Sequence, residues 1–249
     1  IRQDGSFERV STGHHLWILS PSQLPGTILT SSSGGIRYYQ YSETGWKERF
    51  DYPGISDRSF WMLEDTHHQV WITTLNEGLY RIAFNPEEPG QSVVSNFTSA
   101  NGLPSDRGEI WVFMREGDVM ATTMQRLYRF DEQKQVFVLD DRLGEDYVNK
   151  KYSIYGNAKL PDDDELLYRV DIDYKQKRII RASKQADGGY ALEEFYHTLL
   201  QDLFQPSFDL DYPFIWVSAD AGLMRFDLSK TASHNPIQIT TVHLDTLKY

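Results

Sequence analysis

Gln69–Arg81 reads QVWITTLNEGLYR: an apolar run, a short polar turn that ends in glycine, and a second apolar run that ends in arginine. Apolar runs rich in β-branched and aromatic residues around a turn that contains glycine are typical of a β-hairpin. Three further stretches share this design, namely Gly26–Tyr39 (GTILTSSSGGIRYY), Asp118–Phe130 (DVMATTMQRLYRF) and Phe214–Phe226 (FIWVSADAGLMRF). The hairpin is therefore a repeated unit.

The spacing of these hairpins predicts the architecture. The apolar residues that follow the turns are Ile36, Leu79, Leu127 and Leu223, at separations of 43, 48 and 96 residues. Because the last separation is twice 48, a degenerate copy is expected near residue 175, where Glu165–Ala182 supplies two apolar runs around a polar turn. A period of about 45 residues with several short strands is typical of β-propeller blades.

The stretches between the hairpins supply the other strands of each blade. Apolar runs precede the hairpins at His15–Leu19, Phe60–Glu64, Ile110–Arg115, Tyr152–Tyr155 and Phe208–Leu210, and alternating runs follow at Trp46–Phe50, Val93–Phe97 and Gln135–Leu139. We therefore predict an all-β chain, with about five four-stranded propeller blades over residues 1–232. These blades are either a complete ring or part of a larger one from which upstream blades are missing.

One segment fits two interpretations. In Leu192–Phe204 the apolar residues recur at spacings of three and four, which is a helical period. The blade repeat instead requires a strand near Leu192–Tyr196, followed by a loop. We favour the strand, with a short helix near residues 192–204 as the alternative.

The composition excludes several classes of function. The 249 residues include 25 Lys and Arg against 36 Asp and Glu, a net charge of −11, which argues against nucleic-acid binding and direct membrane contact. The chain contains no cysteine, so disulfides, thiolate metal sites and a cysteine nucleophile are excluded. No phosphate-binding or dinucleotide fingerprint occurs, and neighbouring histidines on a strand point to opposite faces. We expect neither a cofactor nor a metal ion.

Asn101–Asp131 (NGLPSDRGEIWVFMREGDVMATTMQRLYRFD) resembles the two-component regulator propeller repeat. That repeat reads roughly GL-x-S-N, an inner strand ending in an acidic residue, then D-x-x-G-x-LWIGT-x-x-GL-x-RYD. Ser59–Phe84 and Phe208–Asp227 are similar to it, and the resemblance extends from Gly26 to Asp227. The third copy has Gln125-Arg126 in place of Gly-Gly, and no copy has the full LWIGT, so the chain resembles a divergent member.

The resemblance implies a sensor β-propeller of a bacterial membrane-bound signalling protein, located in the periplasm. It implies that residues 233–249, which include NPIQITTVHL at Asn235–Leu244, are a closing strand or the start of an immunoglobulin-like domain. A histidine kinase or diguanylate cyclase output would then lie outside this chain, which would itself not be an enzyme. A homodimer formed through the propeller or the following domain is expected.

The candidate binding residues lie in loops at one mouth of the propeller. Loops that enter inner strands, and those joining second and third strands, gather there, and loops on a rigid scaffold commonly carry function. The turn Asp171–Lys175 combines carboxylates, an aromatic ring and a cation, which suit a small polar or carbohydrate ligand, although an ordinary charged hairpin tip has the same composition. The predicted ligand-binding residues are Arg58, Arg107, Arg126, Asp171, Asp173, Tyr174 and Lys175.

No catalytic residue is assigned, because neither a G-x-S-x-G elbow nor an S-x-x-K motif occurs. A propeller enzyme acting on polysaccharide, as a hydrolase or lyase, and a protein-interaction platform are the alternatives to a sensor. Trp71, Trp111 and Trp216 are expected to pack between blades rather than to stack on a ligand. Asp162–Glu165 is interpreted as a solvated turn rather than a calcium site.

Overall fold

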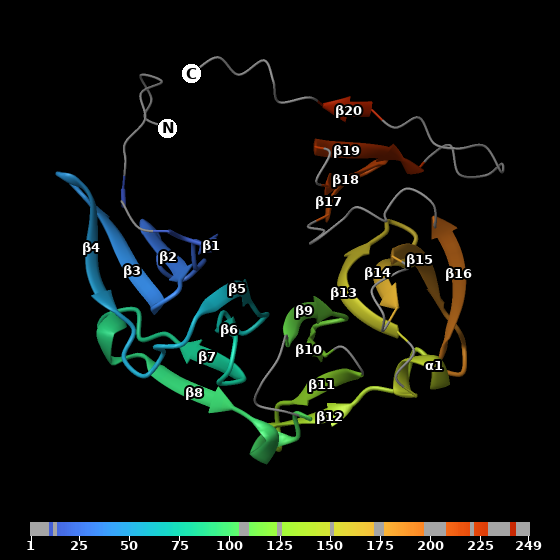
Figure 1. The fold of residues 1–249 in the computed structure, drawn as a ribbon, viewed down its shortest axis with the longest axis horizontal. Coiled ribbons are helices and arrows are strands. Elements are labelled where there is room, and N and C mark those ends of the chain that lie inside the picture. Colours follow the sequence, from blue (N-terminus) through green and yellow to red (C-terminus); the bar gives the residue numbers. More distant parts are fainter. Residues whose placement is uncertain are drawn as a thin grey trace. The chain divides into compact units, whose positions relative to one another are not determined.

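The computed structural model describes residues 10–11, 14–104, 110–123, 126–149, 152–171, 177–196, 208–219, 222–228 and 240–242. In these residues the chain forms twenty β-strands, arranged as five sheets of four strands each. Each sheet is a meander in which consecutive strands are neighbours (Figure 1). The prediction of an all-β chain built from four-stranded blades is confirmed.

The strands follow the predicted order. The first sheet contains β1 (Trp17–Leu19), β2 (Thr27–Ser32), β3 (Gly35–Ser42) and β4 (Gly45–Asp51), and the second β5 (Ser59–Glu64), β6 (Val70–Thr74), β7 (Leu79–Ala83) and β8 (Val93–Phe97). The third contains β9 (Trp111–Arg115), β10 (Asp118–Thr122), β11 (Leu127–Asp131) and β12 (Val136–Leu139). The fourth contains β13 (Tyr152–Lys159), β14 (Glu165–Asp171), β15 (Lys177–Lys184) and β16 (Tyr190–Tyr196), and the fifth β17 (Phe208–Asp211), β18 (Phe214–Ala219), β19 (Gly222–Asp227) and β20 (Thr240–Val242).

Helices are short and few among the described residues. They are the 3₁₀ turns η1 (Pro89–Gln91) and η2 (Ser99–Asn101) and the single-turn helix α1 (Glu145–Val148), which we did not predict. The sequence of Leu192–Phe204 is compatible with a strand or a short helix. Leu192–Tyr196 lies in strand β16, as the blade repeat requires, and residues 197–204 lie outside the described part. In the described part of the chain, no helix has the length and apolar character that a membrane span requires.

The chain divides into two compact units. The first comprises Ile1–Ala121 and Arg129–Val138, and the second comprises Thr122–Tyr128 and Leu139–Tyr249. The first unit therefore contains the sheets β1–β4 and β5–β8, whereas the second contains β13–β16 and β17–β20. The turn between β10 and β11 belongs to the second unit.

Aromatic side chains form the packing between sheets of the first unit. Trp71 on β6 is fully buried, and its ring centroid lies 4.8 Å from that of Phe130 on β11 and 5.1 Å from that of Phe97 on β8. Trp111 is 7% exposed. The prediction that Trp71 and Trp111 pack rather than bind is confirmed, while the side chain of Trp216 lies outside the described residues.

The acidic residue that follows an inner strand closes the next turn. Asp65 accepts hydrogen bonds from the backbone N–H groups of His67 and Gln69 through Oδ1, both at 2.9 Å. Its Oδ2 accepts from the indole Nε1 of Trp71 at 2.7 Å. One carboxylate therefore shapes the β5–β6 turn and fixes the ring that fills the space between sheets.

The glycine of the GLYR stretch is needed for a close approach of two backbones. Gly78 has φ +78°, and a Cβ there would lie 2.4 Å from the carbonyl oxygen of Phe97. Gly35 has the same role in the first sheet, where a Cβ would lie 1.9 Å from the carbonyl oxygen of Ile55. A side chain at either position would push the following outer segment away.

The acidic stretch at residues 162–165 is a solvated turn in part, because Asp162 and Asp163 are exposed as predicted, whereas Asp164 is half-buried. The guanidinium of Arg181 on β15 donates from Nε to Asp164 Oδ2 at 2.5 Å, and also bonds Asp162. Ser183 Oγ donates to Asp164 Oδ2 at 2.7 Å, and Glu165 is buried at the start of β14. The prediction did not include the contacts of Asp164, because strand pairing brings an arginine and a serine from β15 to this turn.

Candidate ligand-binding site

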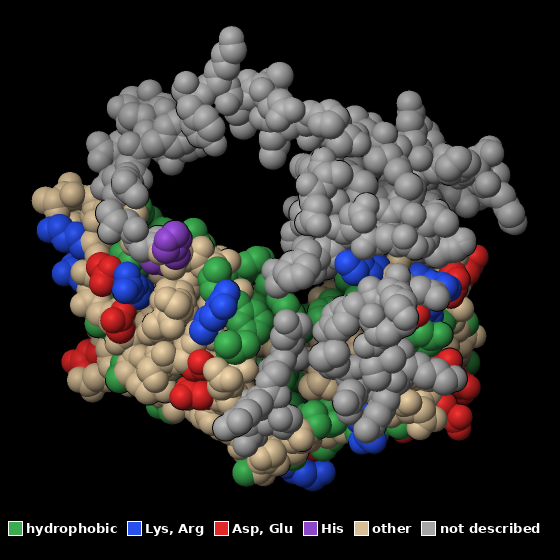
Figure 2. All heavy atoms as spheres, in the orientation of Figure 1, with side chains coloured by type: hydrophobic (Ala, Val, Ile, Leu, Met, Phe, Trp, Pro, Cys, Tyr) green, Lys and Arg blue, Asp and Glu red, His purple; other side chains and the backbone are tan. Residues whose placement is uncertain are grey.

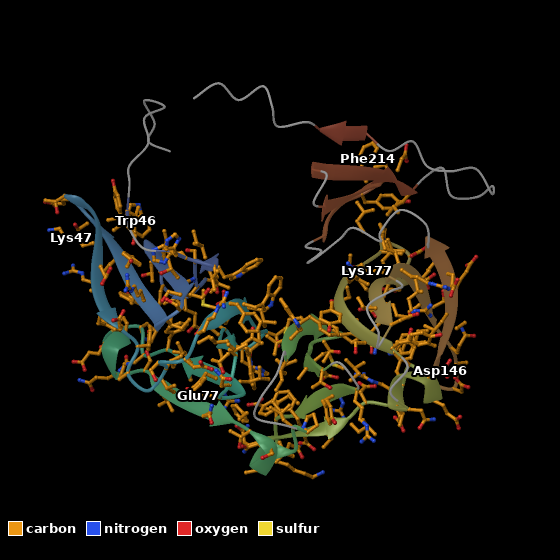
Figure 3. All side chains as sticks on the ribbon, in the orientation of Figure 1. Trp46, Lys47, Glu77, Asp146, Lys177 and Phe214 are labelled. Atoms are coloured by element: carbon orange, nitrogen blue, oxygen red, sulfur yellow. The ribbon has the colours of Figure 1, made fainter. Side chains whose placement is uncertain are left out.

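The second unit contains a cleft beside the single-turn helix, which we call the α1 cleft. Its volume is about 560 Å³. Its lining includes Asp146 and Tyr147 from α1, Tyr152 from β13, Arg169 from β14 and Glu194 from β16. Figure 3 shows Asp146 on α1, at the side of the β13–β16 sheet.

A buried cation lies in the floor of the α1 cleft. The side chain of Arg169 is only 8% exposed, and its guanidinium carbon lies 4.0 Å from the centroid of the Tyr152 ring. Its Nη2 donates to Glu194 Oε1 at 3.0 Å, and Arg178 donates to the same oxygen. Burial acts to raise the pKa of Glu194, but the hydrogen bonds from Arg178 and Arg169 outweigh it and lower that pKa.

Two buried donors in the floor lack acceptors within the described part of the chain. Tyr147 is 2% exposed, and its hydroxyl, which interacts with the Arg169 guanidinium, has no acceptor for its own proton there. The Nε of Arg169 has none either. Burial raises the pKa of Tyr147 to about 12, against the opposing charge of Arg169. Leaving a buried donor unpaired costs about 1–3 kcal/mol, so the floor favours the arrival of an acceptor.

The rim of the cleft is acidic. Glu145 and Asp146 form the first turn of α1, and both are exposed. Glu193 and Glu194 on β16 add two more carboxylates, and the Glu194 side chain is 48% exposed. Acidic and basic side chains lie next to one another over the β13–β16 sheet (Figure 2). A ligand of the α1 cleft therefore meets a cation in the floor and carboxylates at the edge.

Of the seven predicted binding residues, three lie in the described part. Asp171 ends β14 and is paired in register with Tyr152, which lines the α1 cleft. Arg126 follows the β10–β11 turn, whose Thr123 carbonyl accepts a hydrogen bond from Ser153 Oγ at 2.6 Å. The structure therefore connects both residues to the start of β13. Arg107, Asp173, Tyr174 and Lys175 lie outside the described residues.

The third described residue, Arg58, belongs to the first unit. Its backbone N–H donates to Asp57 Oδ1 at 2.8 Å, and the same carboxylate accepts from the backbone N–H of Asn76. Burial acts to raise the pKa of Asp57, but the hydrogen bonds from Asn76 and Arg58 lower it overall. The loop before β5 is thus fastened to the β6–β7 turn, with Arg58 exposed beside it.

Sequence analysis missed Tyr147, Arg169 and Glu194. These residues are widely separated, and no spacing rule connects a loop helix with a middle strand and an outer strand. One signal was present: Arg169 interrupts the apolar run LLYRV, and every residue of β14 from Glu165 to Val170 is buried. A cation in a strand buried on both faces requires a specific partner.

A second cleft lies in the first unit. Its volume is about 540 Å³, and its lining includes Tyr38 and Phe50 together with the polar side chains of Gln40, Arg49 and Glu87. The Tyr38 and Phe50 rings are stacked on each other, with centroids 4.7 Å apart and an interplanar angle of 7°. It contains no buried charge among its described lining residues, so the α1 cleft is the stronger candidate.

Among the described residues, no group of three or more His, Asp or Glu side chains is placed to hold a metal ion. The buried guanidinium of Arg169 has no lone pair to offer a metal ion and repels one by its charge. The arrangement is suited to binding an organic ligand.

No family model matches the chain, and no curated protein is similar to it in sequence. Solved structures do share its fold. The extracellular domain of BT4673 from B. thetaiotaomicron, described as a one-component system, has a TM-score of 0.59 at 16% identity, over 98% of this chain and 32% of that domain. Virginiamycin B lyase from Staphylococcus aureus, in an inactive form with quinupristin, has a TM-score of 0.61 at 16% identity, over 98% of this chain and 76% of the lyase.

PorZ, a surface component of the type-IX secretion system of Porphyromonas gingivalis, has a TM-score of 0.56 at 12% identity, over 94% of this chain and 35% of PorZ. The fold class is therefore the β-propeller, as predicted. Extracellular domains of bacterial signalling systems are among the proteins that share it, and this chain spans about a third of the length of the BT4673 domain.

Proposed function

We propose that this chain is the ligand-binding part of a bacterial membrane-bound sensor, located in the periplasm. Two observations support this proposal. The repeats around Asn101–Asp131 resemble the two-component regulator propeller, and an extracellular signalling domain shares the fold over 98% of the chain. The α1 cleft supplies a place for a small polar ligand, because it combines a buried cation, donors without acceptors and exposed carboxylates.

Binding at the α1 cleft would act on the contact between β14 and the outer strand β16, which lies beyond β15 in the sheet. Glu194 on β16 holds the guanidinium of Arg169 on β14, so a ligand that takes over Arg169 releases the outer strand from one contact. A sensor needs a coupling free energy of only about 1–3 kcal/mol between ligand and output geometry. In the proposed protein, that geometry is the pairing of propellers in a homodimer or the placement of a following domain. The kinase or diguanylate cyclase output lies outside this chain.

A propeller enzyme is the second candidate, because virginiamycin B lyase shares the fold over most of its own length. The described residues that line the α1 cleft include acids and two tyrosines, but no histidine and no serine nucleophile. Fold likeness alone is a weak reason to assign an activity. The sensor is therefore preferred over an enzyme acting on polysaccharide.

A thermal-shift screen against small polar molecules and oligosaccharides, with product analysis of each hit, tests the proposal. A ligand that binds only the native state raises the melting temperature. A sensor gives a shift with the compound recovered unchanged, whereas turnover would establish an enzyme. If no compound shifts the melting temperature, the sensor proposal fails and a protein-interaction platform takes its place.

A further inference from the structure

The α1 cleft already contains one carboxylate bound to its buried cation. Glu194 Oε1 lies 3.0 Å from Arg169 Nη2, although half of the Glu194 side chain is exposed to solvent. An exposed glutamate on an outer strand can turn away when a ligand carboxylate replaces it, because the buried guanidinium then keeps an anionic partner. Glu194 therefore occupies the place that a ligand carboxylate would take.

The floor can bind more than Glu194 provides. The Tyr147 hydroxyl interacts with the Arg169 guanidinium, but neither this hydroxyl nor the Arg169 Nε has an acceptor in the described part of the chain. Both belong to residues that line the α1 cleft. A ligand carboxylate has two oxygens and about four acceptor positions, so it suits a guanidinium and a neighbouring hydroxyl better than a single glutamate oxygen does.

The rim is unsuitable for a simple anion. Glu145 and Asp146 on α1 carry two further negative charges, and both side chains are exposed at the edge of the cleft. Carboxylates placed there repel an acid but attract an ammonium group. A ligand that carries both charges avoids the repulsion.

A neutral sugar fits the described lining less well. Sugars commonly stack on an open aromatic face, and the rings of this cleft are already used. The Arg169 guanidinium covers the ring of Tyr152 at 4.0 Å, and the buried ring of Tyr147 packs with its centroid 5.6 Å from that of Tyr152. Charge, rather than stacking, dominates the cleft.

We propose that the α1 cleft binds a small zwitterion, such as a free amino acid or a dipeptide. The ligand carboxylate displaces Glu194 and bonds Arg169 and the Tyr147 hydroxyl, and the ligand ammonium lies against Glu145 and Asp146. This assignment rests on the proposed sensor function, since it names the class of ligand that the sensor takes.

The test uses the 249-residue chain and isothermal titration calorimetry. The probes are the twenty common amino acids and the dipeptide Ala-Ala. The best binder is then compared with its N-acetyl derivative, which lacks the cation, and with its carboxamide, which lacks the anion. We expect at least one free zwitterion to bind, and each blocked form to bind at least about tenfold more weakly, because a hydrogen bond to a charged group contributes about 1.5–3 kcal/mol.

Two variants of the α1 cleft should change affinity in opposite directions. Tyr147→Phe removes only a buried hydroxyl that has no acceptor in the free protein, so it should fold normally and weaken binding about tenfold. Glu194→Gln removes the competing carboxylate, so it should tighten binding, by up to about fivefold. Glu43→Gln is the control, because Glu43 lies exposed in the β3–β4 turn and is not among the residues that line the α1 cleft. It should leave affinity unchanged.

The outcomes separate this inference from the sensor proposal. Binding by none of the zwitterions, equal binding of a blocked form, or weaker binding after Glu194→Gln would overturn the inference. If a sugar or another compound raised the melting temperature at the same time, the sensor proposal would survive with a different ligand. If a zwitterion bound to Tyr147→Phe with the same affinity as to the parent chain, the site would lie elsewhere. The assignment to the α1 cleft would then be wrong.

Discussion

At the scale of single residues, a few side chains decide how a blade is built. Asp65 is 6% exposed and satisfies three donors, one of which is the indole of the fully buried Trp71. Gly78 is the point where the β6–β7 turn approaches the backbone of Phe97. The blade therefore has two physical requirements. A hydrogen-bond acceptor, here Asp65, must follow the inner strand, and a residue without a Cβ, here Gly78, must end the turn.

Asp65→Ala should lower the free energy of unfolding by about 2–4 kcal/mol, because it leaves a buried indole N–H unpaired and opens the turn. Urea unfolding measures the change. Glu43→Ala is the control, since Glu43 lies exposed in the β3–β4 turn and should give a difference within about 0.5 kcal/mol. Equal effects of the two changes would show that the Asp65 turn contributes nothing.

Gly78→Ala should lower the free energy of unfolding by more than Gly117→Ala does. Both glycines have positive φ, +78° and +86°, so each alanine incurs about 1–2 kcal/mol of backbone strain. Only at Gly78 does the new Cβ also meet a backbone oxygen, whereas nothing lies within 4 Å at Gly117. The difference between the two variants in urea unfolding isolates the clash, and a difference near zero would contradict it.

At the scale of elements, neighbouring sheets are joined by cations as well as by apolar rings. The guanidinium of Arg81 on β7 lies 5.1–5.4 Å from the ring centroids of Trp71, Phe97 and Phe130. Its Nη2 donates to Gln135 Oε1, on the far side of the sheet boundary, at 2.7 Å. Arginine at the end of the GLYR stretch therefore connects the second sheet to the third.

Arg81→Ala should destabilise the chain by about 2–3 kcal/mol, since it removes cation–π contacts, a hydrogen bond and the packing of the side-chain stem. Arg81→Lys should recover part of the loss, because it retains the charge but not the planar group. Urea unfolding of both variants checks the order. Equal stability of the two would show that only the charge matters.

The ion pairs between the β13–β14 turn and Arg181 on β15 predict how the sheet responds to acid. Hydrogen bonds from Ser183 and Arg181 outweigh burial and lower the pKa of Asp164 below its ordinary 3.8. A carboxyl whose pKa is lower in the folded state stabilises that state above its unfolded pKa, and this contribution disappears as the pH falls below it. Stability should therefore decrease below about pH 4.

Asp164→Asn tests this acid dependence. The variant cannot titrate at this position, so it should be less stable than the parent at pH 7, and the difference should shrink as the pH falls below about 4. Thermal unfolding at pH 7, 5 and 3 measures both chains. A constant difference at every pH would contradict the assignment.

At the scale of the whole molecule, the net charge of −11 acts on the folded state through self-repulsion. Adding NaCl to about 0.15 M shortens the screening length to about 8 Å, which weakens repulsion between distant surface charges more than it weakens short, partly buried pairs. The melting temperature at pH 7 should therefore rise from low salt to 0.15 M. A fall would show that attractive pairs such as Arg181 with Asp164 dominate.

Patterns along the chain are enough to predict most of the secondary structure and the repeating design of the sheets. Strand alternation, turn residues and the acidic end of an inner strand act between neighbours in the chain, so patterns such as QVWITTLNEGLYR reveal them. The helix α1 was missed because a single turn carries no period. The α1 cleft can be recognised only in the tertiary structure, because strand pairing and the path of a loop bring Tyr147, Arg169 and Glu194 together. A sequence pattern does not predict this contact. The attraction between a buried guanidinium, an aromatic ring and a carboxylate depends on their distances in space, and these residues are far apart in the chain.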